Sequence, residues 1–218
     1  MKKRRFICYL LIGILLLLTG CKSELKASEY VQANLDLLFQ GETEGAKAFI
    51  NASTSELEDM YDNGIYAFVE SYLTSGVDDE GEYTDYFAYI VKEIFMTMRY
   101  QVGEAKKIDA DTYEVEVKYN PVNVFTLFIE AVDALSAELE DRIESGYYEG
   151  TEEEQEQLML IDYLETSYVL LGEAYLQMEY DEQETFTFTV TRGEANVPEL
   201  GEKEINEFIE CILALDKL

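Results

Sequence analysis

Apolar residues recur every three or four positions in three stretches of the first half of the chain, the spacing of one helix face. We expect a helix with Ser28 as its N-cap and Gly41 at its end. A second begins with the capping box Ser53-Thr54-Ser55-Glu56 and ends at Ser75-Gly76. A third carries its apolar stripe from Tyr83 to Met98.

The apolar period changes to two in residues 113–119, where tyrosines and valines alternate with charged residues. Residues 185–191 alternate threonine with phenylalanine and valine. This alternation is typical of strands with one buried face. Residues 100–107 are a plausible partner strand, joined through the turn Asp109-Ala110-Asp111. The pattern predicts a small antiparallel sheet of about three strands.

A long helical hairpin is expected between these strands, at about residues 121–179. Asn120-Pro121 supplies an N-cap and a first-turn proline for its first helix, which ends at Ser145-Gly146. Thr151 and Glu154 form a capping box for its second helix. The apolar stripes 125–139 and 161–178 are expected to pack as core, and a last helix starts at about Glu202. The predicted fold class is α+β and mostly helical.

The N-terminus carries the strongest motif in the chain. Four basic residues at 2–5 precede an apolar run from Phe6 to Leu18. This run is shorter than the roughly 20 residues of a transmembrane helix and has the length of a signal-peptide core. The run ends in Leu18-Thr19-Gly20-Cys21, which matches the lipobox of bacterial lipoproteins. That match implies cleavage after Gly20 and acylation of the Cys21 thiol. We therefore expect a signal peptide at 1–20, a lipidated tether at 21–27 and a single extracytoplasmic domain at 28–218.

The net charge of the chain after Gly20 limits which partners are expected. After Gly20 the chain has 12 basic residues against 46 acidic ones, a formal net charge of −34. So negative a body repels phosphate backbones and anionic lipid headgroups. Nucleic acid is therefore not an expected partner, and any membrane attachment is expected to run through acyl chains at Cys21.

Histidine is absent, which excludes histidine-ligated zinc, Ser-His-Asp and Cys-His catalysis, and a histidine base. Cys211 is the one cysteine left after Cys8 leaves with the leader and Cys21 is acylated, so no internal disulfide forms. We interpret Cys211 as a buried small hydrophobe, with a reactive thiol as the alternative. No metal and no cofactor is expected.

Several acidic and aromatic groupings have a structural interpretation and a functional one. Asp109 and Asp111 lack the rest of a calcium loop and suit a turn. The acidic runs 78–80 and 152–156 suit a solvated loop and a helix N-terminus better than a cation site. A pair of carboxylates for glycoside hydrolysis stays an open alternative, but the acidic residues are too numerous to identify which two would act. The 17 tyrosines favour core packing over a sugar platform.

Beyond the lipobox, the body resembles uncharacterised surface lipoproteins of Gram-positive Firmicutes, which contain a domain of unknown function. The resemblance rests on Tyr30 to Gly41 (YVQANLDLLFQG), Tyr61 to Tyr72, and Arg99 to Tyr119 (RYQVGEAKKIDADTYEVEVKY). It implies an NTF2-like or cystatin-like α+β fold and supplies no functional residue.

The expected function is that of a lipid-anchored, non-catalytic module on the outer face of the cell membrane. Its partner would be a protein, a wall polymer or a small ligand. The alternatives are an envelope enzyme that uses carboxylates alone and, less favoured by the order of helices and strands, a transporter's substrate-binding lipoprotein.

Overall fold

The computed structural model describes residues 25–74, 82–193 and 197–215. The leader, the lipobox with Cys21, the predicted helix end Ser75-Gly76 and the acidic run 78–80 lie outside these residues. The elements follow in the order α1 (Ala27–Gln40), α2 (Thr43–Ala46), α3 (Thr54–Tyr72), α4 (Glu82–Met96), β1 (Arg99–Lys107), β2 (Thr112–Asn120), α5 (Val124–Glu144), α6 (Glu152–Gln177), β3 (Glu184–Arg192), β4 (Pro198–Leu200) and α7 (Glu202–Ile212).

The described strands form one antiparallel sheet in the order β1-β2-β3-β4, so the predicted α+β class is confirmed. The three predicted strands are present, and β4 adds three residues alongside the end of β3. Alternation places Val115 and Val117 of β2 on the buried face, while Glu116 and Lys118 lie on the exposed face. The sheet thus has one apolar face to cover.

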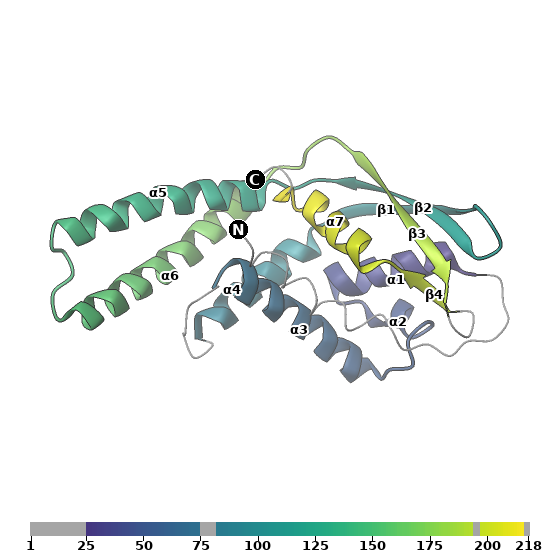
Figure 1. Cartoon of the computed structure of the whole chain (residues 1–218), viewed down its shortest axis with the longest axis horizontal. Coiled ribbons are helices and arrows are strands. Elements are labelled where there is room, and N and C mark those ends of the chain that lie inside the picture. Colours follow the sequence, from purple (N-terminus) through teal and green to yellow (C-terminus); the bar gives the residue numbers. More distant parts are fainter. Residues whose placement is uncertain (1–24, 75–81, 194–196, 216–218) are drawn as a thin grey trace.

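Helices α1 and α7 cover that face, with α3 and α4 further from the sheet (Figure 1). Phe208 of α7 is fully buried. Its ring packs on Phe39 of α1 at 6.2 Å, on Tyr119 of β2 at 5.3 Å and on Phe188 of β3 at 5.2 Å. Large aromatic side chains therefore join the two layers at the centre of the core.

Both predicted capping boxes are present, at Ser53 with Glu56 and at Thr151 with Glu154. The prediction that Ser28 is an N-cap is wrong, because Ser28 is the second residue of α1, whose N-cap is Lys26. The Ser28 hydroxyl donates to the carbonyl of Gly103 at 2.9 Å. The prediction for Asn120-Pro121 is also wrong. Asn120 is the last residue of β2, paired with Arg99, and Asn123 is the N-cap of α5.

The α5–α6 hairpin is present and projects from the body as an arm (Figure 1). Phe128, Leu135 and Leu139 of α5 are buried along its seam, as are Leu164 and Leu171 of α6. Ile161 contradicts the prediction that the whole second stripe is core, because it is 44% exposed. The tip of the arm has a small apolar cluster of its own, built on Leu135, Leu139 and Tyr148.

Candidate interaction surface

The base of the arm is held against the sheet by backbone and aromatic contacts. The Asn123 side chain accepts from the amide of Glu179 at 2.8 Å, and the Asn123 amide donates to the carbonyl of Glu179. The guanidinium of Arg99, at the start of β1, stacks 3.6 Å from the centre of the Tyr180 ring. The two ends of the hairpin therefore meet at the first residue of β1.

The two helices are joined near the tip by charged groups. Arg142 of α5 donates to Asp162 of α6 at 2.5 Å and to Glu138 at 2.6 Å. The Tyr148 hydroxyl donates to the same oxygen of Asp162 at 2.7 Å. The Tyr148 hydrogen bond and the Arg142 charge hold the pKa of Asp162 below its usual value. This cluster orders the tip rather than forming an open site.

Helix α6 also packs on α4, and the two helices run in the same direction. Three contacts in sequence order show this: Tyr83 donates to Glu165 at 3.4 Å, Ile90 lies beside Gly172, and Thr97 approaches Met178. The Tyr86 ring lies 5.8 Å from the Tyr168 ring. Helix α4 thus fixes one flank of α6 while α5 covers another.

The remaining flank of α6 carries four apolar side chains that are open to solvent. Its exposed fractions are 47% for Leu158, 44% for Ile161, 56% for Val169 and 84% for Leu176. At 3.6 residues per turn these four side chains fall within an arc of about 80°. They lie in a strip on one side of the arm, and exposed Glu165 falls within the same arc, between Ile161 and Val169.

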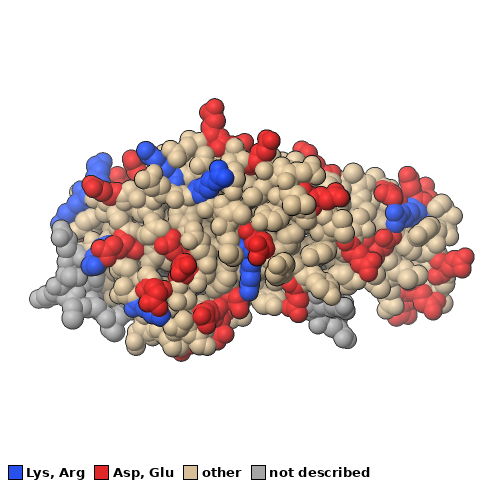
Figure 2. All heavy atoms as spheres, turned by 180° about the vertical axis from the view of Figure 1, so that it is seen from behind, with Lys and Arg blue, Asp and Glu red and all other residues tan. Residues whose placement is uncertain are grey.

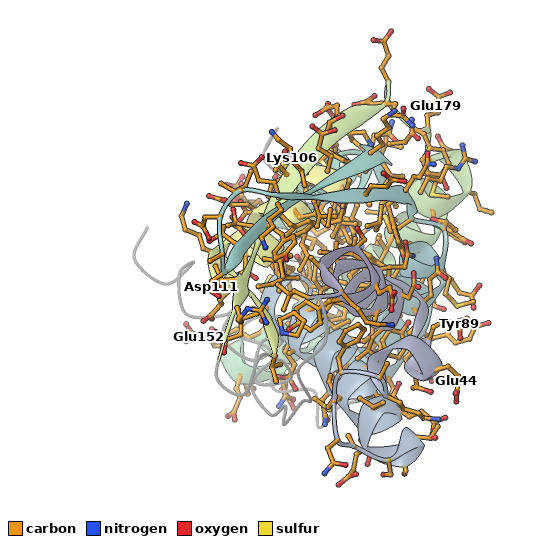
Figure 3. All side chains as sticks on the ribbon, turned by 90° about the vertical axis from the view of Figure 1, so that its right-hand side faces the viewer. Glu44, Tyr89, Lys106, Asp111, Glu152 and Glu179 are labelled. Atoms are coloured by element: carbon orange, nitrogen blue, oxygen red, sulfur yellow. The ribbon has the colours of Figure 1, made fainter. Side chains whose placement is uncertain are left out.

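Two tyrosines of α4 extend this strip. Tyr86 and Tyr89 are 49% and 65% exposed, and Tyr89 points away from the body in Figure 3. Because α4 and α6 are parallel and touch, the helical positions of these tyrosines place them on the same side as Val169 and Leu176. We call the six side chains Tyr86, Tyr89, Leu158, Ile161, Val169 and Leu176 the α4–α6 face.

The arm that carries this face is strongly acidic. Residues 124–177 contain 14 acidic residues and a single basic one, Arg142. Figure 2 shows the same asymmetry: red carboxylates surround one blue side chain at the arm's end, and the other visible blue side chains lie on the body. Glu165 is exposed on α6 between Ile161 and Val169, and Glu173 is exposed beside the apolar strip. The face therefore combines exposed apolar side chains with carboxylates that lie among and beside them.

The buried polar side chains of the described residues bear on the alternative of a carboxylate enzyme. Their buried polar side chains are Thr43, Thr74, Thr84 and Ser167, with no carboxylate among them. The same residues contain no group of three carboxylate or thiol side chains placed to hold a metal ion. A facing pair of buried carboxylates would favour a carboxylate enzyme, and that hypothesis rests on the abundance of acidic residues alone.

The residues singled out by the sequence have mixed outcomes. Cys21, the predicted lipidation site, lies outside the described residues. Cys211 is half-buried on α7 rather than fully buried. It lies near the Tyr119 hydroxyl, which donates to Glu184 at 2.9 Å, and burial and these neighbours raise the pKa of Tyr119. Asp109 closes the predicted β1–β2 turn by accepting from the amide of Asp111.

The α4–α6 face is the feature that sequence reasoning missed. A signal for it exists: Leu158, Val169 and Leu176 lie off the stripe that was assigned to the core. A helix with apolar residues outside its buried stripe has a second surface to cover. Within the described residues no helix is long and apolar enough to cross a bilayer.

Comparison with known proteins gives one similar structure. No family model and no curated protein matches the chain. A crystal structure of a candidate lipoprotein (ycdA) from Bacillus subtilis is similar at 18% sequence identity and a TM-score of 0.48. The match covers 85% of this chain and 55% of that one, so the chain spans about half the length of that protein. An NTF2-like or cystatin-like fold stays a prediction.

Proposed function

We propose that this chain is a lipid-anchored extracytoplasmic lipoprotein that acts as a non-catalytic binding module. The observation that carries the proposal is the lipobox Leu18-Thr19-Gly20-Cys21 at the end of a basic and then apolar leader. Two acyl chains on Cys21 would supply an anchor that the acidic body cannot supply by surface charge. The exposed apolar strip on the arm supports binding as the activity.

The direction of α1 supports display of the arm away from the membrane. Ser28, in the first turn of α1, bonds to Gly103, whereas Asp36, later in α1, accepts from Tyr100 at 2.7 Å. Because β1 starts at the base of the arm, α1 starts at the end further from that base. Figure 1 shows the arm and the β1–β2 turn at opposite ends of the molecule.

The short tether then places the body close to the anchor. The six residue-to-residue steps from Cys21 to Ala27 span at most about 20 Å when fully extended. An acyl group at Cys21 would therefore hold the sheet end of the body near the bilayer. The tip of the arm would be the part furthest from it.

Detergent-phase partitioning of the expressed full chain tests the anchor. Wild type is expected in the detergent phase, and Cys21→Ala is expected in the aqueous phase or retained as an uncleaved precursor of higher mass. Cys8→Ala and Cys211→Ala are matched controls, since each removes one thiol without touching the lipobox. Equal partitioning of a cleaved Cys21→Ala chain and wild type would contradict the proposal.

A further inference from the structure

The α4–α6 face has the composition of a docking surface with no partner in the described part of this chain. Its α6 strip runs from Leu158 to Leu176, about 27 Å along the helix axis at 1.5 Å per residue. Tyr86 and Tyr89 widen it across the contact between α4 and α6. Aromatic and aliphatic side chains on a rigid helix pair are typical of surfaces that bind another helix.

The negative charge of the arm indicates which kind of partner can bind the α4–α6 face. With 14 acidic residues and one basic residue on the arm, a second copy of the same acidic arm would be repelled. An anionic lipid surface would be repelled for the same reason. On α4, the cation Lys92 is paired with Asp62 of α3 at 2.6 Å, which offsets its charge beside the face. The surface thus complements a helix with an apolar stripe and basic flanks.

We propose that the α4–α6 face binds a basic amphipathic helix of a partner protein. This inference deepens the proposed binding function and is independent of the lipid anchor. The partner's apolar side chains cover Leu158, Ile161, Val169 and Leu176, and its lysines or arginines lie beside acidic residues such as Glu165 and Glu173. Binding in this mode requires both the apolar stripe and the basic flanks to share one helix.

The experiment uses residues 21–218 without acylation, because every residue of the described core lies within 25–213. The probe is a fluorescent 18-residue peptide with leucines on one helical face and lysines on the other. One control peptide scrambles the same residues so that the leucines share no face, and another replaces lysine with glutamate. Fluorescence anisotropy at 0.15 M salt measures each dissociation constant.

The amphipathic basic peptide is expected to bind about tenfold or more tightly than the scrambled peptide, and the glutamate peptide is expected not to bind. Ile161→Ser combined with Leu176→Ser is expected to weaken binding about tenfold or more. Ile108→Ser is the matched control, because Ile108 is 47% exposed but lies at the β1–β2 turn. It is expected to leave the dissociation constant unchanged.

Three results would overturn the proposal. Equal affinity for the scrambled peptide would mean that charge alone attracts the probe. Sedimentation showing a dimer that Leu176→Ser disrupts would identify a second copy as the occupant. Binding of anionic phospholipid vesicles that the same variant abolishes would identify a lipid surface. Because the soluble chain carries no acyl group, none of these results depends on whether Cys21 is acylated.

Discussion

Arg142 and Asp162 form a 2.5 Å ion pair that joins α5 to α6 close to the tip of the arm. Tyr148 donates to the same carboxylate and is itself buried in the tip cluster. The tip of the arm lies far from α7 and the sheet (Figure 1), so its order depends on this local cluster. Two predictions follow from the pair.

Asp162→Asn is expected to lower the melting temperature at pH 7 by about 2–4 °C, because the amide keeps the shape but loses the charge-assisted contacts. Hydrogen exchange at the tip, in residues 139–160, is expected to rise more than exchange in the sheet. Asp133→Asn on the exposed side of α5 is the control and is expected to change neither quantity. Faster exchange throughout the sheet would contradict a local role for the pair.

The ion pair of Arg142 and Asp162 predicts that the stability of the fold depends on pH. The folded-state pKa of Asp162 lies below its unfolded value, chiefly through the Tyr148 hydrogen bond. Its stabilisation is therefore complete above the unfolded pKa, near 4, and is lost as the pH falls through the lower folded pKa. The difference in melting temperature between wild type and Asp162→Asn should be constant from pH 5 to 7. It should shrink below about pH 4, and an unchanged difference at pH 2.5 would contradict the assignment.

Substitution of glycine by alanine is expected to have opposite effects on stability at Gly41 and at Gly172. Gly41 ends α1 at φ 67°, and an added Cβ would lie 3.0 Å from the Tyr61 ring. Gly41→Ala is expected to destabilise the fold by about 1–2 kcal/mol. Gly172 lies within helix α6 with only an ordinary contact to Ile90, so Gly172→Ala is expected to stabilise by about 0.5 kcal/mol. Urea unfolding of both variants measures the contrast, and equal effects would contradict it.

Alanine substitutions at Phe208 and at Leu176 distinguish a residue that stabilises the fold from one that is proposed to bind a partner. Phe208→Ala empties a fully buried aromatic site and is expected to cost about 3–5 kcal/mol in unfolding free energy. Leu176→Ala removes a side chain that is 84% exposed and is expected to change stability by less than about 0.5 kcal/mol. A large loss of stability in Leu176→Ala would mean that this side chain is part of the core.

The sequence predicted those features whose determinants are local. Both capping boxes are present because each needs only a hydroxyl and a carboxylate three residues apart. Ser28 was misassigned because its hydroxyl bonds to Gly103, 75 residues away, which no local pattern reveals. Asn120 was misassigned because pairing with Arg99 extends β2 through that residue.

The candidate surface was not predicted because helical periodicity shows which residues share a face but not what covers that face. The sequence pattern puts Ile161 and Leu164 on one stripe, yet Leu164 is buried and Ile161 is 44% exposed. The difference depends on where α4 and α5 lie around α6, which tertiary packing decides. The acidity of the arm, by contrast, can be counted directly from the sequence.

The mass of the mature N-terminal peptide tests the central claim most directly, because the proposed location depends on Cys21. Mass spectrometry of the protein purified from its native envelope is expected to show a chain that starts at Cys21 and carries a diacylglyceryl group on its thiol. An intact leader that begins at Met1, or a mature terminus with an unmodified Cys21, would contradict the account.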